Sequence, residues 1–372
     1  MQPTPSDSVS ATLNPLIRAA IERHGGWLPF DRFMALALYA PGAGYYANHS
    51  RKFGALPGSG SDFITAPELS PLFGRALARA VAQALQASAT RQVWEFGAGS
   101  GELAAQLLDA LGDAVDSYTI VELSATLRAR QQARLSRHID RVRWVDALPP
   151  TMLGVVVGNE LLDAMPVQLL RFDGDVWFER GVTLGDGSGP AWCWSDRPTT
   201  LRPPLDARFQ PGTVVELHAQ ATAFVTTLAE RLQRGAVYLI DYGFPQAEYY
   251  HPQRVGGTLM CHRAHRADTD PLTDVGEKDI TAHVDFTAVA LAAQDAGLDV
   301  LGYTSQAHFL MNCAILDDLR GADLRTIANA QKLLNEHEMG ELFKVIGLAK
   351  GCEAAFGGSP LGFGRGDRTH TL

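Results

Sequence analysis

The chain has few cysteines, four in 372 residues, and it lacks long apolar runs. The cysteines lie far apart and form no C-x-x-C pair, at Cys193, Cys261, Cys313 and Cys352. This spacing argues against a zinc ribbon or a dithiol redox pair, favours a reducing compartment and predicts no metal site. No segment approaches the roughly 20 apolar residues that a membrane-spanning helix needs. We therefore expect neither a disulfide-stabilised protein nor an integral membrane protein.

Positive charge is in deficit, because 32 Lys and Arg face 41 Asp and Glu, a formal net charge of −9. This balance supplies no field to attract a phosphate backbone, so nucleic acid is a poor candidate substrate. A cationic partner, such as an arginine or lysine of another protein, fits the sign better, although sign alone does not select it. The N-terminal residues lack a basic segment followed by an apolar run, so we expect no secretory signal and a cytoplasmic location.

A composition of 46% hydrophobic and 20% charged residues predicts a folded protein with one large catalytic unit and substantial additions. We expect disordered tails at residues 1–12 and 356–372, and N-terminal helices within 13–90. Residues 41–70 are rich in Gly, Pro and Ser yet carry four aromatic side chains. Such a segment predicts a lid over a site, or a loop that only packs against the rest of the fold.

From Arg91 onward, short apolar runs alternate with helical patterns, which predicts an α/β fold with a doubly wound, Rossmann-like parallel sheet over residues 91–355. The predicted strands include QVWEF, YTIVE, VRWVD, GVVVGN, AVYLIDYG and FKVIGLAKG. The alternation breaks at about 168–215, where Asp173-Gly174 and Asp186-Gly187 indicate hairpin turns and hence a small antiparallel insertion. We expect a helix over about 213–233 and a long polar loop over 244–282.

The most informative segment is VWEFGAGSG, an apolar strand that runs into a glycine-rich turn and then a helix. Its three glycines allow a tight turn and a close approach of the backbone to a ligand. The G-x-G-x-x-G pattern of dinucleotide-binding turns is incomplete here. An acid before G-x-G-x-G is instead the pattern that methyltransferases place under the methionine part of their cofactor. We therefore predict that S-adenosylmethionine binds at Glu95, Gly97, Ala98, Gly99 and Gly101.

Two acids follow the next predicted strands. Glu122, followed by Leu123, lies about twenty residues past the glycines, where a carboxylate can bind both ribose hydroxyls. Asp146, followed by Ala147, ends the third strand, where a carboxylate can accept a hydrogen bond from the adenine amino group. Either acid alone could be a solvated strand end. A glycine turn with two strand-end acids in register is far more specific for this cofactor.

Five segments together resemble the MidA family of methyltransferases. They are residues 61–70 (SDFITAPELS), 94–101 (WEFGAGSG), 159–167 (NELLDAMPV), 241–243 (DYG) and 279–286 (DITAHVDF). The resemblance runs from about residue 15 to 350 and includes Met339-Gly340. One departure is Ser61, where family members commonly have glycine, a change that we expect to be harmless. The resemblance implies a seven-stranded class I methyltransferase sheet with an N-terminal helical and lid region.

The family includes a mitochondrial protein arginine methyltransferase. The implied acceptor is therefore a guanidinium of a partner protein, with a respiratory-complex subunit as one candidate. The NELLD stretch is similar to the acidic loop of protein arginine methyltransferases, in which the first carboxylate of a Glu-Leu-Leu run binds the substrate. By that similarity Glu160 is the guanidinium-binding residue and Asp163 the second acid, with Asn159 at the cofactor. Glu160 could instead cap the next helix or bind the cofactor.

The remaining predicted site residues come from the aromatic loop and from later strand ends. They are Phe63 and Thr65 for the cofactor, with Glu68 nearby, and His283, Asp285 and Tyr242 for the acceptor. Asp285 could instead be the N-cap of the following helix, and Tyr242 could be a core residue. Cys261, His262 and His265 have metal-ligand side chains, but no fourth partner is near them, so we expect no metal site there.

Other functions stay open on the sequence alone. A non-catalytic assembly chaperone could keep the fold, although the intact cofactor acids argue against it. A small-molecule or RNA methyltransferase is a second alternative, and the acidic charge disfavours RNA. A nicotinamide dehydrogenase shares the fold class, but its glycine spacing is missing. A homodimer is compatible with the sequence.

Overall fold

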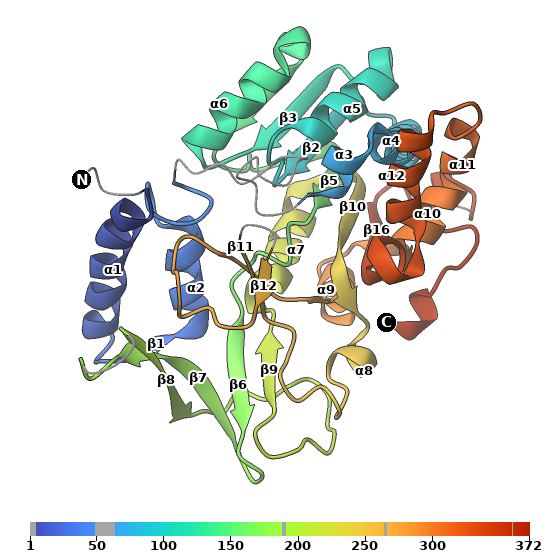
Figure 1. The fold of residues 1–372 in the computed structure, drawn as a ribbon. Helices are drawn as coiled ribbons and strands as arrows, with labels where there is room; N and C mark the ends of the chain where they lie inside the picture. The colour runs from blue at the N-terminus through green and yellow to red at the C-terminus, as the bar shows by residue number, and fades with distance from the viewer. Residues whose placement is uncertain (1–4, 49–63, 188–190, 264–265, 359) are drawn as a thin grey trace.

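The computed structural model describes residues 5–48, 64–187, 191–263, 266–358 and 360–372. Its central sheet has seven main strands in the order β15-β16-β10-β5-β2-β3-β4 (Figure 1), and the short β14 (Val284–Asp285) also pairs with β10. The strands are β2 (Gln92–Phe96), β3 (Ser117–Val121), β4 (Val142–Val145), β5 (Met152–Asn159), β10 (Leu232–Phe244), β15 (Asp299–Ser305) and β16 (Phe343–Lys350). Only β16 runs antiparallel to its neighbours. The predicted seven-stranded α/β sheet is confirmed.

Helices cover both faces of this sheet, which explains why its inner strands are apolar along most of their length. One face carries α4 (Pro71–Ser88), α5 (Glu102–Leu111), α10 (Gln306–Asn312) and α12 (Leu324–Leu334). The other carries α7 (Ala219–Arg231) and α9 (Phe286–Asp295). Helix α6 (Ala125–Arg134) follows β3 and lies beside α5 (Figure 1). Because both faces are covered, a ligand can reach the sheet only at the ends of its strands.

A second lobe is built on the predicted antiparallel insertion. Its strands are β6 (Gln168–Phe172), β7 (Trp177–Leu184), β8 (Trp192–Pro198), β9 (Val214–Leu217) and the short β1 (Leu28–Pro29). The helices α1 (Pro5–Arg23) and α2 (Phe30–Tyr39) bury Ile17 and Phe33 in the same apolar cluster as Val182 of β7. The N-terminal helices therefore belong to this insertion lobe and not to the central sheet.

Three local predictions need correction. The predicted disordered tail at residues 1–12 is wrong from Pro5 onward, because α1 begins there and packs on the insertion lobe. The helix predicted over about 213–233 begins only at Ala219, because residues 214–217 pair with β6 as β9. The polar segment 244–282 is more than a loop, since it contains α8 (Gln246–Tyr249) and a small sheet of β11 (Met260–Arg263), β12 (Arg266–Asp268) and β13 (Asp279–Thr281).

The predicted disordered tail at 356–372 is also wrong for its described residues. Phe363 is buried, and its ring lies 5.5 Å from that of Phe309 on α10. Gly302 and Gly347 leave room for this ring, because a Cβ at either position would lie within 2.6 Å of it. Asp367 accepts a hydrogen bond from a backbone N–H of β15 at 3.0 Å. The C-terminal segment thus closes the β15–β16 edge of the sheet through contacts that are remote in sequence.

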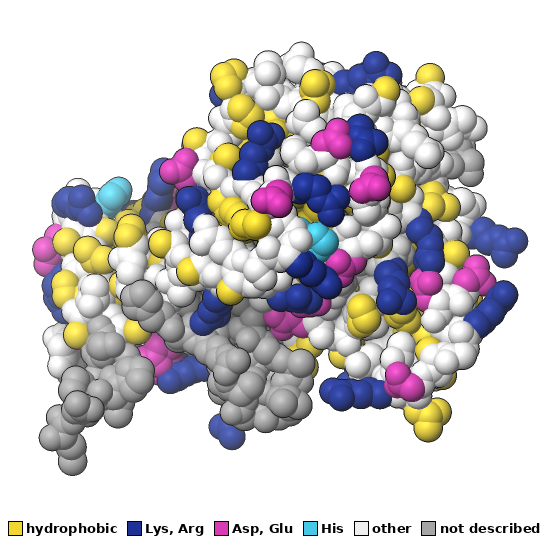
Figure 2. All heavy atoms as spheres, turned by 90° about the horizontal axis from the view of Figure 1, so that it is seen from above, with side chains coloured by type: hydrophobic (Ala, Val, Ile, Leu, Met, Phe, Trp, Pro, Cys, Tyr) yellow, Lys and Arg dark blue, Asp and Glu magenta, His cyan; other side chains and the backbone are white. Residues whose placement is uncertain are grey.

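The distribution of charged side chains on the surface is consistent with the excess of acidic over basic residues in the sequence. On the face shown in Figure 2, basic side chains lie among acidic ones. Mixed signs of this kind give no extended positive field over that face, which a phosphate backbone would require. Among the residues that the structure describes, no helix is both long enough and apolar enough to cross a bilayer.

Truncating Phe363 should measure how strongly the C-terminal segment holds the sheet. We expect Phe363→Ala to lower the free energy of unfolding by about 3–5 kcal/mol, because it empties a packed aromatic site. Urea denaturation followed by circular dichroism gives this value. The control is Leu324→Ala, at a side chain that is 86% exposed, and it should change stability by less than about 1 kcal/mol. Equal effects of the two variants would mean that the segment contributes nothing to the fold.

Candidate active site

The parallel strands bring the residues that follow them to one edge of the sheet. Val121 pairs with both Phe96 and Val145, and Phe96 also pairs with Gly158. The residues that follow β4, β3, β2 and β5 therefore lie in a row. The chain order of the strands reverses between β2 and β5, and ligands of doubly wound sheets bind at such a switch point.

The turn after β2 holds three glycines in a backbone conformation that other residues rarely adopt. Gly97, Gly99 and Gly101 have φ of +67°, +53° and +84°. A Cβ at Gly97 would lie 3.2 Å from Leu161, and one at Gly101 would lie 3.4 Å from Gln131. Gly101 is also the N-cap residue of α5. The turn therefore brings the N-terminus of α5 close to a ligand, which suits the carboxylate of an amino acid.

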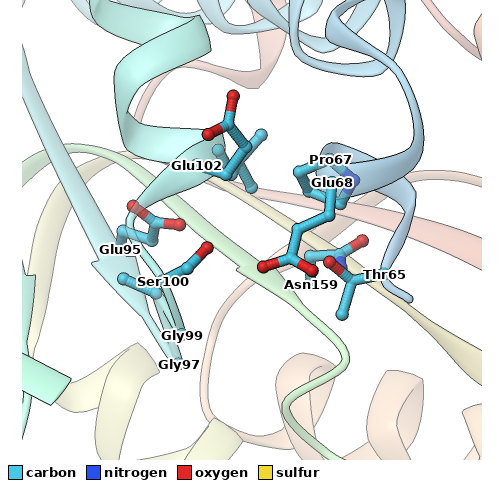
Figure 3. Close-up of a pocket in the computed structure, with 11 residues that line it drawn as sticks. Thr65, Pro67, Glu68, Glu95, Gly97, Gly99, Ser100, Glu102 and Asn159 are labelled. Atoms are coloured by element: carbon cyan, nitrogen blue, oxygen red, sulfur yellow. The ribbon is translucent and has the colours of Figure 1, made fainter. Parts of the chain in front are cut away.

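A pocket lies between this turn and the short helix α3 (Ala66–Leu69) (Figure 3). It is lined by Thr65, Pro67, Glu68, Glu95, Gly97, Ala98, Gly99, Ser100, Glu102, Leu103 and Asn159. In Figure 3 the side chain of Glu68 extends from α3 toward Thr65 and Asn159, across the pocket from Glu95. The Oδ1 atom of Asn159 is buried and finds no hydrogen-bond partner among the described residues. This atom is therefore available to a donor on a ligand, such as an amino group.

Glu95 lies buried below the glycine turn. The hydroxyl of Tyr118 donates a hydrogen bond to its Oε2 atom at 2.7 Å. Burial raises the pKa of Glu95 to about 7, and the hydrogen bond from Tyr118 only partly opposes this. A positively charged ligand group nearby would favour the ionised carboxylate. The position therefore fits a cofactor that carries an ammonium and a sulfonium.

Glu122 is held at the end of β3 through both carboxylate oxygens. The N–H of Ser124 donates to Oε1 at 2.7 Å, and Nε2 of Gln131 donates to Oε2 at 2.9 Å. Gln131 also donates to the carbonyl of Gly99 at 3.0 Å and accepts from the indole N–H of Trp144 at 2.9 Å. Gln131 thus joins the ends of β2, β3 and β4. Nothing in its sequence neighbourhood indicated this role, because it depends on how α6 packs.

Leu123, Asp146 and Ala147 are exposed beside Glu122. The backbone N–H of Glu122 donates to the carbonyl of Val145 at 3.0 Å, which brings the chain leading to Asp146 alongside. The side chain of Leu123 is 80% exposed. An apolar side chain in the open between two strand-end acids is suited to pack against a planar base. The structure therefore brings the predicted adenosine residues to one place, next to the glycine turn.

The loop that follows β5 is fixed by Asp241 of β10. Its Oδ2 atom accepts hydrogen bonds from the backbone N–H groups of Leu161, Leu162 and Asp163 at 3.0, 2.7 and 3.2 Å. Glu160, just before them, has φ of +52°, which is costly for a residue with a side chain and typical of functional sites. The Asp241 carboxylate thus holds Glu160 in a strained conformation beside the pocket. In the sequence Asp241 belongs to the motif DYG, which does not indicate that its carboxylate holds this loop.

Four acids gather behind the cofactor pocket, and we call them the acidic group: Glu160, Asp163, Asp241 and Asp279. Burial, and then the charge of Asp241, raise the pKa of Glu160 to about 8. The same two causes raise the pKa of Asp163 well above its usual range. The Oδ1 atom of Asp163 is buried and lacks a hydrogen-bond partner within the described part of the chain. The acidic group would therefore be stabilised by a cation that enters it.

Tyr242 lies beside Glu160 of the acidic group, and His283 lies beside Tyr242. The hydroxyl of Tyr242 is 3.5 Å from Oε2 of Glu160, and its ring centroid is 4.0 Å from that of Phe343. The ring of His283 meets Tyr242 edge-on at 6.0 Å and stacks on Phe244 at 5.3 Å. Burial lowers the pKa of His283 to about 4, so its imidazole is neutral at pH 7. Tyr242 therefore contacts both the core and the acidic group.

Asp285 caps a helix in the structure. Its Oδ1 atom accepts a hydrogen bond from the N–H of Ala288 at 3.1 Å, so it is the N-cap of α9. The helix-capping alternative is confirmed. Its side chain is buried at the end of β14. Asp285 therefore caps α9 through Oδ1, and its role in the acceptor site stays a prediction.

The aromatic segment predicted as a lid is described only in part. Phe63 lies outside the described residues, while Thr65 lines the pocket. The hydroxyl of Tyr46 donates to both carboxylate oxygens of Asp279 at 2.8 and 2.9 Å. Tyr39 of α2 donates to the carbonyl of Ala164 at 2.7 Å. Tyrosines of the N-terminal region thus connect the insertion lobe to the acidic group, a contact that sequence analysis missed.

Comparisons with known proteins agree with this geometry. A family model described as a putative S-adenosyl-L-methionine-dependent methyltransferase matches residues 76–304. Two crystal structures from Burkholderia thailandensis each align over the full length of both chains. One, a candidate methyl transferase bound to S-adenosyl-homocysteine, is 50% identical with a TM-score of 0.93. The other, an uncharacterised protein of the same superfamily, is 48% identical with a TM-score of 0.89.

The chain is also similar to proteins at lower sequence identity. The protein arginine methyltransferase NDUFAF7 of Danio rerio mitochondria is 27% identical over 367 residues, covering 87% of this chain and 83% of the relative. The NDUFAF7 homologue of Caenorhabditis elegans is 26% identical over 338 residues, covering 80% and 75%. This chain is thus similar over most of its length to proteins named for arginine methylation.

The glycine turn gives a direct test of the pocket. We expect Gly99→Val to abolish the binding of S-adenosylhomocysteine in calorimetry, because Gly99 lines the pocket and a side chain there would take up space that the ligand needs. The control is Gly112→Val, at a residue with nearly the same φ of +51° but with open space around its Cβ position. Both variants strain the backbone at positive φ, so thermal unfolding must first show that each is folded. If Gly112→Val lost binding as well, strain and not the pocket would be responsible.

Proposed function

Because this chain belongs to the family of S-adenosylmethionine-dependent methyltransferases and uses S-adenosylmethionine as its cofactor, we propose that its acceptor is an arginine of a partner protein. The observation that carries this proposal is the acidic group next to the cofactor pocket. Glu160 and Asp163 form no ion pair with any Lys or Arg in the part of the chain that the structure describes. Carboxylates buried without a counter-charge favour a ligand that brings one.

A guanidinium matches these acids better than a neutral acceptor does. It keeps its positive charge at any ordinary pH and presents a planar fork of N–H donors that two carboxylate oxygens can bind. Glu160 is partly exposed, whereas Asp163 and Asp241 are buried. Glu160 therefore contacts the guanidinium directly, and Asp163 adds negative charge behind it. Asp241 acts on the backbone and holds this arrangement in place.

The chain's own residues have three tasks in this reaction. The glycine turn and Asn159 hold the amino-acid part of the cofactor, and Glu122 and Asp146 hold its adenosine part. S-adenosylmethionine, when bound, supplies a methyl group on an activated sulfonium. Glu160 aligns the guanidinium nitrogen, which accounts for most of what a displacement at an activated carbon requires. Tyr242 and His283 exclude water from the other side.

The names of the relatives support a protein acceptor, since several are mitochondrial protein arginine methyltransferases. A subunit of a respiratory complex is our candidate partner, and a cytoplasmic location remains our expectation. Two alternatives make different predictions. A small-molecule methyltransferase would label no protein, and a chaperone with little catalysis would bind the cofactor without transferring its methyl group.

Replacing Glu160 separates these functions. We expect Glu160→Gln to lower kcat/KM for an arginine acceptor by roughly a hundredfold or more, because the guanidinium loses its charged partner and its alignment. The affinity for S-adenosylhomocysteine, measured by calorimetry, should stay nearly unchanged. The acceptor is found by incubating the enzyme with methyl-labelled S-adenosylmethionine and a lysate from cells that lack its gene. A labelled protein band that contains methylarginine supports the proposal, and equal loss of cofactor affinity and turnover would exclude the guanidinium role.

The ionisation of Glu160 gives a second test. Only the carboxylate binds a guanidinium well, so kcat/KM should rise with pH up to about 8, the pKa of Glu160, and then level off. Glu160→Gln should lose most of this rise, and the part that remains would come from the raised pKa values of Asp163 and Asp241. Because the pKa in the folded state is raised above its unfolded value, the associated stability is present below about pH 4.3 and is lost as pH rises to about 8. Urea denaturation should therefore show that Glu160→Gln is at least as stable as the wild type at pH 8. A wild-type profile without this rise would contradict the assignment.

A further inference from the structure

A basic cluster surrounds Phe244 at the carboxyl end of β10. The guanidinium carbon of Arg254 lies 4.5 Å from the centroid of the Phe244 ring. The ammonium of Lys344 lies 5.8 Å from the same centroid, and the ring of His283 stacks on Phe244 at 5.3 Å. Sequence analysis did not identify this cluster, because its members come from four separate segments of the chain.

The two cations of the cluster differ in their partners. Lys344 is satisfied, since it lies 3.5 Å from Oε1 of Glu341 and also donates to the carbonyl of Glu341. Arg254 is different. Its side chain forms no ion pair or hydrogen bond with the residues that the structure describes, and its Nε atom is buried. A buried guanidinium donor without an acceptor costs free energy. Arg254 as a residue is only partly buried, so an acceptor from outside the chain can pair with the remaining N–H groups of its guanidinium.

Arg254 lies on the acceptor side of the active site. Continuous ring contacts lead from Phe244 through His283 to Tyr242, whose hydroxyl is 3.5 Å from Glu160. His283 is neutral at pH 7, so the positive charge at this end comes from Arg254 and Lys344. Groups that carry opposite charges when ionised thus lie at the two ends of one row of side chains. The acidic group lies at one end and the unpaired guanidinium at the other.

We propose that Arg254 binds an acidic side chain of the protein substrate, a few residues from the arginine that enters the acidic group. This inference rests on the proposed function and adds a specificity-determining residue to it. The planar guanidinium of Arg254 matches a carboxylate as a bidentate partner. A segment with an arginine and a nearby acid would bind in one orientation, because the reverse would place like charges together.

The test uses peptide binding in the presence of S-adenosylhomocysteine, so that it does not depend on turnover. Short labelled peptides with a central arginine and an amidated C-terminus each carry one glutamate at one flanking position, and matched peptides carry glutamine there. Fluorescence anisotropy measures their dissociation constants with the full-length enzyme. We expect one or two glutamate positions to bind about tenfold or more tightly than their glutamine counterparts.

The variant Arg254→Gln should remove this preference and weaken the glutamate peptide to the level of the glutamine peptide. The control is Arg320→Gln, at an arginine whose side chain is 83% exposed and pairs with Asp317, and it should keep the preference. Thermal unfolding checks that both variants are folded. The absence of a glutamate preference in the wild type, or its survival in Arg254→Gln, overturns the proposal.

The same peptides distinguish this proposal from the proposed function. Methyl transfer from labelled S-adenosylmethionine is measured for each peptide in parallel. If the glutamate preference depends on Arg254 but no arginine is methylated, the proposed role of Arg254 is supported and the proposal of an arginine acceptor fails. If glutamate and glutamine peptides bind and react equally, the arginine acceptor stands and Arg254 has no role in specificity.

Discussion

The active site depends on the carboxylate of Asp241, a buried residue of β10. It accepts hydrogen bonds from three backbone N–H groups of the loop that follows β5. Each of these bonds is made to a charged acceptor when the acid is ionised, so each is stronger than an ordinary backbone hydrogen bond. Together they outweigh the strain of Glu160 at positive φ. Without Asp241 the loop would lose these three bonds, and Glu160 would be held less firmly in its place next to Asn159, which lines the pocket.

The second constraint is that four acidic side chains lie close together in the interior. Acids that lie close together raise one another's pKa, and burial adds to this effect. The protein tolerates the cost because tyrosines bind part of the group and because a cationic ligand can neutralise the rest. Tyr46 donates to both oxygens of Asp279 from outside the central sheet. The insertion lobe is therefore part of the active site and cannot be treated as a separate addition.

The opposite signs of the acidic group and Arg254 suggest how a flexible substrate could be oriented. Glu160, Asp163 and Arg254 form no ion pair with the described part of the chain, and Glu160 and Arg254 lie at the two ends of one row of aromatic side chains. Phe244, His283 and Tyr242 keep these charges apart, since direct contact between them would pair them internally.

Local sequence alone determined the strand–helix alternation, the glycine turn and the strand-end acids, because each depends on short-range periodicity or on a backbone that only glycine adopts. It also indicated Glu160 through a resemblance. It did not indicate Gln131, the orienting role of Asp241 or the unpaired Arg254, since these roles arise only when remote segments meet. The C-terminal segment shows the same limit, because Phe363 looks like part of a polar tail until Gly302 and Gly347 open a place for its ring. Tertiary packing decided these features because burial and hydrogen-bond partners are properties of neighbours in space.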